Sequence, residues 1–180
     1  MAETGTSSFG IIDVPLPSGA TMVSQVLYGS IGYATGSTLG CLKAAQEAKT
    51  PRRTILFTGD GSMQLTVQEV ATMLRQGLKP ILVLLNNDGY VIERCIHGEN
   101  RVYNDISSWK WQELLSFFNA ANVPSRSWLA RTRGELESVI NDAEFAAADR
   151  IQLLEVMMDR HDAPRALQVQ AKLSAQVNAG

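Results

Sequence analysis

Apolar residues in this chain are grouped into short runs, separated by longer segments of mixed character. Three of the runs are rich in apolar and β-branched residues and predict strands at 53–58 (RTILFT), 81–86 (ILVLLN) and 151–158 (IQLLEVMM). The second run is apolar throughout instead of alternating, which is typical of a strand buried on both faces. The runs therefore predict the interior of a parallel sheet.

The segments between the strands have the spacing of amphipathic helices. We expect helices at 24–48, ending before Pro51, at 62–76, at 107–120, from Thr132 to about Ala147, and after Asp162 and Pro164. Thr132 and Glu135 have the spacing of a capping box. Strands that alternate with helices predict an α/β fold: a doubly wound, mainly parallel sheet with helices on both faces.

The composition favours one globular domain without a nucleic-acid partner. The 180 residues are 45% hydrophobic and 19% charged, which suits a single domain with a real core. Lys and Arg number 16 against 18 Asp and Glu, giving a net charge of −2. The chain has no basic stripe of the kind that binds nucleic acid.

We expect a soluble, cytoplasmic protein with no membrane partner. The first residues, MAETGTSSFG, have neither the basic segment nor the apolar stretch of a secretory signal, and no apolar run reaches membrane length. Cys41 and Cys95 lie far apart, with no Cys or His at a zinc-like spacing. We interpret both as reduced packing residues.

Two polar clusters follow two of the predicted strands. GDGS (59–62) directly follows RTILFT, and NNDG (86–89) begins at the last residue of ILVLLN. Alone, NNDG is typical of a turn, and YVIERCI after it would then form the second strand of a hairpin. The hairpin leaves GDGS unexplained. A parallel sheet instead brings both clusters to its carboxyl edge, where ligands bind.

The groups at this edge are hard oxygen donors. Asp60 offers a carboxylate, Asn87 offers an amide oxygen, and the glycines leave backbone carbonyls accessible. These donors suit Mg²⁺ or Ca²⁺ and not zinc. A helix N-terminus and glycine-lined backbone amides bind phosphate. The combination predicts a diphosphate held through a divalent ion.

The order of these motifs resembles the thiamine-diphosphate-binding motif, in which GDG, a helix, a strand and NN follow one another. Beyond that motif, five segments are similar to the pyruvate decarboxylase family, nearest its fungal members: AETGTSSFG, QVLYGSIGYATG, GDGSMQLTVQEVATMLRQGLKP, LNNDGYVIERCIHG and YNDISSW. The resemblance runs from residue 2 to about residue 175. It implies that residues 1–180 are the carboxyl-terminal, cofactor-binding domain of a larger enzyme. It also implies thiamine diphosphate and Mg²⁺ as cofactors, and non-oxidative decarboxylation of a 2-oxo acid, pyruvate to acetaldehyde and CO2.

The resemblance implies a role for individual residues. Asp60, Asn87 and the carbonyl of Gly89 would hold Mg²⁺. The implied cofactor-binding positions are Thr4, Thr6, Gly29, Ser30, Ile31, Gly59, Asp60, Gly61, Ser62, Asn87, Gly89, Tyr90, Val91, Ile92 and Glu93. Gly61 and Ser62 match the diphosphate end, and Gly29–Ile31 match the aminopyrimidine end. Ile31 matches the aliphatic residue that forces the cofactor into a bent shape; its other interpretation is an ordinary core residue. The other interpretation of Ser62 is a plain helix N-cap, which is compatible with binding the diphosphate.

Glu93 is the implied catalytic residue. The resemblance makes it an acid beside the reacting centre, where partial burial would raise its pKa. A glutamate at this position is otherwise an exposed surface residue. His97, within the matched IHG, is interpreted as structural.

The resemblance also implies that the chain is incomplete as a catalyst. Upstream domains of the family supply a glutamate that activates the aminopyrimidine and a pair of histidines, whereas His97 and His161 here are not adjacent. We expect a homodimer or tetramer that needs the amino-terminal pyrimidine-binding domain to act on its small 2-oxo acid substrate. Two alternatives stay open: a binding or regulatory subunit without catalysis, and a domain of another thiamine-diphosphate enzyme, such as an indolepyruvate decarboxylase or an acetolactate synthase. A dinucleotide-binding domain is disfavoured, because GDGSMQ lacks the third glycine of that fingerprint.

Overall fold

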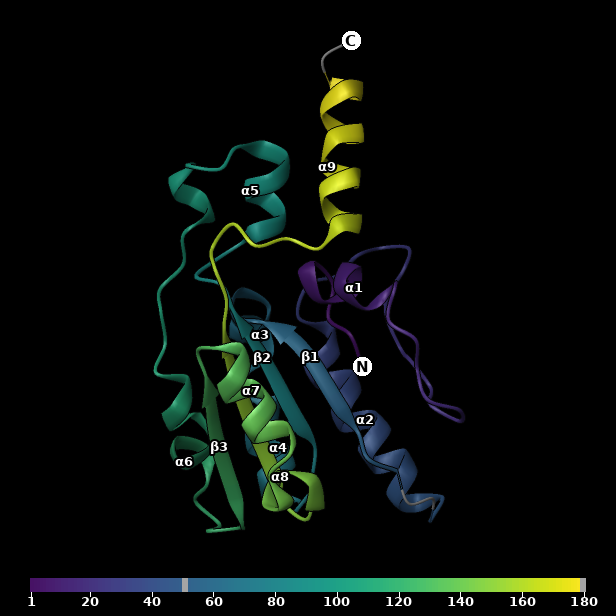
Figure 1. Cartoon of the computed structure of the whole chain (residues 1–180). Helices are drawn as coiled ribbons and strands as arrows, with labels where there is room; N and C mark the ends of the chain where they lie inside the picture. Colours follow the sequence, from purple (N-terminus) through teal and green to yellow (C-terminus); the bar gives the residue numbers. More distant parts are fainter. Residues whose placement is uncertain (50–51, 179–180) are drawn as a thin grey trace.

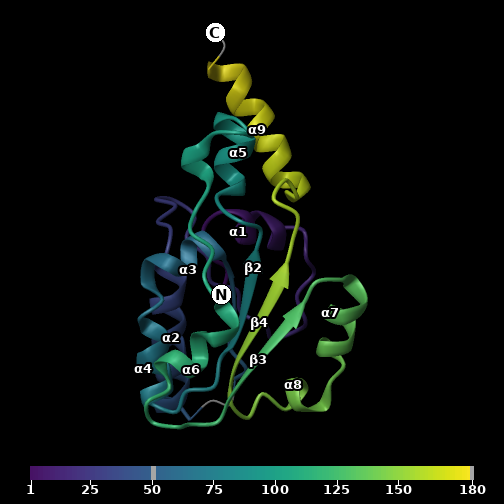
Figure 2. The same cartoon turned by 90° about the vertical axis from the view of Figure 1, so that its left-hand side faces the viewer.

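The computed structural model describes residues 1–49 and 52–178 and has a four-stranded sheet between two layers of helices (Figure 1 and Figure 2). The strands are β1 (Ile55–Gly59), β2 (Ile81–Asn86), β3 (Ser125–Ala130) and β4 (Ile151–Met157). Their spatial order is β1-β2-β4-β3, and every neighbouring pair is parallel. The predicted α/β class is confirmed.

Helices cover both faces of the sheet and its carboxyl edge. Figure 2 shows α2 (Tyr33–Glu47), α4 (Glu69–Arg75) and α6 (Leu114–Phe118) on one face, and α7 (Arg133–Ile140) and α8 (Ala143–Ala147) on the other. At the carboxyl edge lie α1 (Thr6–Ile11), α3 (Asp60–Thr66), α5 (Val91–His97) and α9 (Arg165–Asn178). Two short 3-10 turns, Val102–Asn104 and Trp111–Glu113, lie between α5 and α6.

The main core lies between the sheet and the α2–α4 layer. Leu56, Leu82 and Leu84 point from the strands toward Met63 and Met73, and all five side chains are fully buried. Full burial of such a side chain contributes about 1.5–3 kcal/mol. The apolar run of β2 was predicted to be buried on both faces, and residues 81–84 are buried. This core fixes the strands whose carboxyl ends carry the two polar clusters.

The helix expected at 24–48 is shorter than predicted, because it begins only at Tyr33. Gly29 and Gly32 have φ angles of 58° and 88°, in the left-handed region that a continuous right-handed helix excludes. Residues 24–32 therefore form an irregular segment with Gly32 as the N-cap of α2. Pro51, expected to follow the helix, lies outside the described residues.

Several other boundaries differ from the prediction. The helix expected at 62–76 is divided into α3 and α4, and only a 3-10 turn and α6 occur within 107–120. The strand β3 and the helices α1 and α5 were not predicted. Because α5 occupies 91–97, the hairpin interpretation of NNDG is wrong. The capping box is confirmed: Thr132 Oγ1 accepts from the N–H of Glu135 at 3.2 Å, and the N–H of Thr132 donates to Glu135 Oε2 at 3.1 Å.

The cysteines and the helix lengths bear on the environment of the chain. Cys41 and Cys95 are free thiols, each half-buried. In the part of the chain that the structure describes, no helix combines the length and the apolar character needed to cross a bilayer.

Candidate functional site

The two polar clusters meet because β1 and β2 are neighbours in register. Gly59, at the end of β1, pairs with Leu85 near the end of β2. Asp60 follows Gly59 directly as the first residue of α3, and its Oδ2 accepts from the N–H of Gly89 at 3.0 Å. Asn87 follows β2 in the other loop. The predicted metal ligands therefore come together at the carboxyl edge of the sheet.

The Asn87 amide lies between the other two predicted metal ligands. One terminal atom of its side chain lies 3.0 Å from the carbonyl oxygen of Gly89 and 3.2 Å from Oδ1 of Asp60. With nitrogen at this position, the amide donates to both oxygens; with oxygen there, three oxygen atoms face one another. Neighbouring oxygens around an octahedral Mg²⁺ are about 2.9 Å apart when the Mg–O distances are about 2.0–2.1 Å. The donor set and its spacing therefore fit a magnesium ion.

Asp60 is almost completely buried, with 3% of its surface exposed. Burial raises the pKa of its carboxyl from 3.8 to about 6, although hydrogen bonds from the backbone N–H groups of Gly89 and Gly61 oppose the rise. Among the described residues, the carboxylate is thus paired with backbone dipoles and forms no salt bridge. A bound cation would stabilise its charged form.

Two glycines allow the loops to approach each other. Gly89 has a φ of 125°, and a Cβ at this position would lie 2.7 Å from Nη2 of Arg94 and in conflict with the carbonyl oxygen of Asn104. A Cβ at Gly61 would overlap the ring of Tyr90, with Cδ1 only 2.9 Å away. Any larger side chain at either position would push the loops apart.

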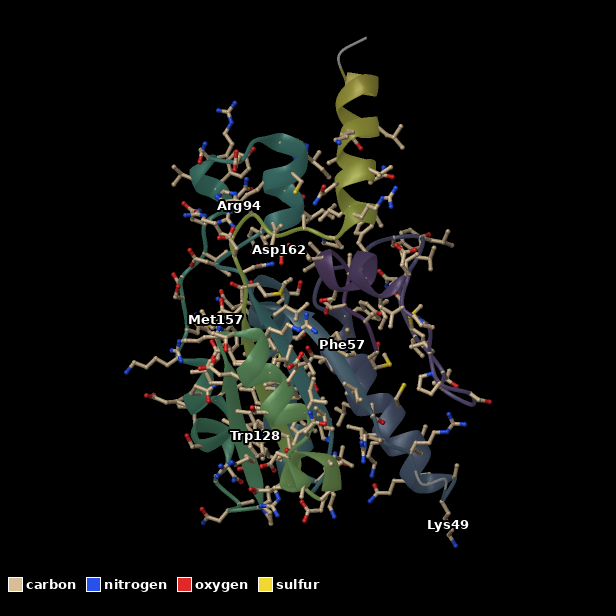
Figure 3. The ribbon with its side chains drawn as sticks, viewed as in Figure 1. Lys49, Phe57, Arg94, Trp128, Met157 and Asp162 are labelled. Atoms are coloured by element: carbon tan, nitrogen blue, oxygen red, sulfur yellow. The ribbon has the colours of Figure 1, made fainter. Side chains whose placement is uncertain are left out.

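Arg94 holds the Asn87–Gly89 loop from behind. Its side chain is buried, and Nη2 donates to the carbonyl oxygen of Asp88 at 2.7 Å and to Oδ1 of Asp105 at 2.8 Å. Figure 3 shows Arg94 at the carboxyl edge with Asp162, and Lys49 at the opposite end of the molecule. Arg94 therefore supports the Asn87–Gly89 loop, which carries two of the predicted metal ligands.

A small, open pocket of about 40 Å³ lies beside these ligands. Its lining comes from four stretches of the chain: Thr4, Gly5, Thr6 and Ser7; Ile31; Gly59, Asp60, Gly61 and Ser62; and Asn87, Gly89, Tyr90, Val91 and Ile92. Gly29, Ser30 and Glu93 are the cofactor-binding positions of the prediction that do not line it. The pocket nevertheless gathers segments that are far apart in the sequence.

Two lining residues have unused capacity to contact a ligand. Thr4 Oγ1 is buried and has no hydrogen-bond partner among the described residues. A buried hydroxyl without a partner is costly, and a polar ligand atom would satisfy it. Ile31 is 43% exposed and lines the pocket, so it is not an ordinary core residue.

Gly29 and Ser30 lie beside the lining. A Cβ at Gly29 would lie 3.7 Å from Cγ2 of Thr4, so this turn borders the wall that carries Thr4. The N–H of Ser30 donates to Oε1 of Gln25. The pair therefore forms the outer part of the wall that Ile31 completes.

Glu93 lies in the first turn of α5, outside the pocket lining. Its Oε2 is 2.6 Å from Nδ1 of His97, and the two side chains are 40% and 53% exposed. The pair forms a polar bridge along one face of α5. The catalytic role of Glu93 stays a prediction.

Gly5, Ser7 and Arg94 belong to the site but were not singled out in the sequence. Gly5 and Ser7 stand within AETGTSSFG, a segment that carried the resemblance, and the short α1 that begins at Thr6 brings Ser7 to the pocket. Nothing in the sequence singled out Arg94. Arginine is almost never fully buried unless it is paired, so a surface position was the default expectation.

The chain was compared with known proteins. The family model described as thiamine pyrophosphate enzyme, C-terminal TPP binding domain, matches residues 4–156. The pyruvate decarboxylase of Candida glabrata is 51% identical over 179 residues, covering 99% of this chain and 31% of that protein. Pyruvate decarboxylase isozyme 1 of Saccharomyces cerevisiae is 48% identical over 179 residues, with the same two shares of 99% and 31%. The chain thus spans about a third of the length of these relatives.

A solved structure supports the fold. The benzoylformate decarboxylase of Polynucleobacter necessarius superposes with a TM-score of 0.65 at 20% identity, over 76% of this chain and 25% of that one. At this identity the likeness concerns the architecture of the sheet and its helices.

Proposed function

This chain belongs to the family of thiamine pyrophosphate enzymes, as their C-terminal, TPP-binding domain, and on that premise we propose that its pocket binds thiamine diphosphate through Mg²⁺. The single observation that carries the proposal is the convergence of Asp60, Asn87 and the Gly89 carbonyl on one point beside the pocket. Oxygen donors at this spacing suit a magnesium ion that also contacts a diphosphate. The N–H groups of Gly61 and Ser62, at the start of α3, would hold the diphosphate.

We propose further that the domain serves in decarboxylation of a 2-oxo acid, pyruvate to acetaldehyde and CO2. The named activity of the fungal relatives, at 48% and 51% identity, supports this choice. When bound, thiamine diphosphate supplies the electron sink that lets CO2 leave. Thr4 would offer a hydroxyl to the ligand and Ile31 would shape the wall at the aminopyrimidine end. Glu93, which directly follows the lining residue Ile92, would be the proton donor or acceptor after CO2 has left.

The proposed active site includes a partner domain. The pocket is open, and the segment that leads to Ile31 exposes large apolar side chains: Val26, Leu27 and Tyr28 are 86%, 91% and 91% exposed. An apolar surface of this kind beside a ligand site is typical of an interface. We infer that an amino-terminal pyrimidine-binding domain covers it in a cytoplasmic homodimer or tetramer.

Calorimetric titration of this chain with thiamine diphosphate, with and without Mg²⁺, tests the proposal. We expect binding that requires Mg²⁺ and that Asp60→Asn abolishes, because the neutral amide removes the anionic ligand. Asp88→Asn is the matched control: Asp88 is exposed in the same loop region and is not among the proposed ligands. Binding that is indifferent to Mg²⁺ and to Asp60→Asn would show that the site is wrongly assigned.

A further inference from the structure

Glu3 is a completely buried carboxylate with no cationic partner. None of its surface is exposed. Its Oε1 accepts from the N–H groups of Thr4 at 2.7 Å and Gly32 at 3.1 Å, and its Oε2 accepts from the N–H of Ala34 at 3.1 Å. No salt bridge in the described part of the chain includes it. Burial raises the pKa of this carboxyl, because the three N–H groups offset only part of the lost hydration.

A buried charge held only by dipoles is a poor source of stability. Replacing water by protein costs several kcal/mol for an ion, and the hydrogen bonds together with the positive end of α2 repay only part of that cost. Stability alone therefore does not explain a carboxylate at this position. Its bonds show what else it does.

The carboxylate of Glu3 joins two walls of the pocket from behind. Thr4, whose hydroxyl has no partner among the described residues, is the first residue of one wall. Gly32 directly follows Ile31, which lines the opposite wall. Glu3 itself is not part of the lining. The turn that leads to Ile31 also lies close to Thr4, since a Cβ added at Gly29 would be 3.7 Å from Cγ2 of Thr4.

Polar contacts, and not the core, hold the segment that ends in this turn. Val26, Leu27 and Tyr28 are nearly fully exposed, so burial contributes little to holding this segment. Oη of Tyr33 donates to the carbonyl oxygen of Ala2 at 2.6 Å and accepts from the N–H of Gln25 at 3.1 Å. Gly32 is held on its other side, where its carbonyl oxygen accepts from Oγ1 of Thr66 at 2.7 Å. Glu3 is the charged member of this set of bonds.

We propose that Glu3 is a positioning residue, whose carboxylate holds the Gly29–Ile31 turn against Thr4 and so forms the aminopyrimidine side of the pocket before the ligand arrives. The inference rests on the proposed function of the pocket. A wall that is already ordered spares the ligand the entropic cost of ordering it. The proposed diphosphate side is built by residues 59–62 and 87–89, whereas the hydrogen bonds of the Glu3 carboxylate in the described chain go to Thr4, Gly32 and Ala34. Its effect is therefore restricted to one end of the ligand.

Glu3→Gln separates the two ends of the pocket. The glutamine keeps the shape of the side chain, but its amide nitrogen must face at least one backbone N–H, so one bond is lost together with the charge. Affinity is measured with Mg²⁺ for thiamine diphosphate and for inorganic pyrophosphate, which has no aminopyrimidine. We expect the affinity for thiamine diphosphate to fall about tenfold, as for the loss of one charge-assisted hydrogen bond. The affinity for pyrophosphate should stay within about twofold, as for a distant, independent site.

Hydrogen–deuterium exchange of the ligand-free chain gives the second readout. Glu3→Gln should speed exchange at residues 24–34 and leave β2 and β4 unchanged. Glu155→Gln is the matched control for exchange at residues 24–34 only, and not for affinity, because Glu155 is also a buried glutamate but accepts from Asn86 and Gln112 instead of from this turn. Thr66→Val serves as the substitute test if Glu3→Gln does not fold. It removes the bond on the other side of Gly32 without removing a buried charge, and should speed exchange at the same residues.

The outcomes separate the two proposals. A wild-type chain without Mg²⁺-dependent affinity for either ligand would contradict the proposed function, and the inference would fall with it. A wild-type chain that binds both, combined with a Glu3→Gln variant that loses both equally or neither, would overturn the role of Glu3 alone. Unchanged exchange at 24–34 in both Glu3→Gln and Thr66→Val would overturn it as well.

Discussion

Burial and the proposed metal favour opposite protonation states of Asp60: burial favours the neutral acid, and a metal ion favours the carboxylate. Without a cation, burial holds the pKa at about 6, so the carboxyl is protonated below that pH. Mg²⁺ binds only the ionised form, and proton and cation therefore compete. The pH at which ligand binding fails should be set by this one group.

We predict that Mg²⁺-dependent affinity for thiamine diphosphate falls as the pH decreases through about 6, approaching tenfold per pH unit below it. Above that value Asp60 is ionised and the affinity should level off. Titrations in one buffer series between about pH 5 and about pH 8 would measure it. An affinity that stays constant across this range would mean that Asp60 does not have to lose a proton to bind the metal.

Gly89 shows how much the loop geometry depends on a missing side chain. We predict that Gly89→Ala lowers the free energy of unfolding by roughly 2 kcal/mol or more, because the new Cβ meets Arg94 and Asn104 at a φ unfavourable for alanine. Denaturant unfolding measures the loss. Gly134→Ala, in α7 with open space around the site, should instead be neutral or stabilising by up to about 1 kcal/mol. Equal effects of the two substitutions would contradict the crowding at Gly89.

Among the secondary-structure elements, those with strong local patterns were predictable. β1, β2 and β4 stood out because each is an apolar run buried against helices. β3 did not, since it is an edge strand whose residues are mostly half-exposed, and its SRSWLA sequence alternates weakly. The late start of α2 depends on left-handed glycines and on capping by the distant Glu3, which a local pattern does not contain.

β4 supports the Asn87–Gly89 loop that follows β2. Glu155 on β4 accepts from Nδ2 of Asn86 and from Nε2 of Gln112, each at 2.8 Å. Glutamine at position 155 can accept from only one of these two donors, which loosens the bonds beside Asn86, the neighbour of Asn87. We therefore predict that Glu155→Gln weakens Mg²⁺-dependent pyrophosphate binding about three- to tenfold. Calorimetry tests this, with the exposed Glu113→Gln as the control. An affinity equal to wild type would show that the loop holds its shape without β4.

The candidate site was predictable where one motif sat at a strand end. Asp60 and Asn87 needed only the rule that neighbouring parallel strands end at the same edge. Thr4 and Ile31 came from the family resemblance, because nothing in their local sequence distinguishes a pocket wall from a turn or a core. The role of Glu3 could not be predicted, since two of its three partners lie 29 and 31 positions away and all three bonds are to backbone.

For the molecule as a whole, the open pocket and the apolar segment beside it indicate a site completed by another domain. We predict that this chain, given thiamine diphosphate, Mg²⁺ and pyruvate, releases no acetaldehyde above the uncatalysed background. Co-expression with the upstream domains of a fungal relative should restore release. Robust turnover by the chain alone would mean that the catalytic groups have been misassigned.

The pairing of β1 with β2 has one more consequence. Side chains alternate between the faces of a strand, so a slip of one residue in either strand would turn its side chains over and move the loop that follows by about 3.3 Å. The Asp60 and Asn87 oxygens would then no longer meet. The proposed magnesium site would therefore form only in chains with the correct register, and only those chains would gain the stabilisation that a bound ligand gives.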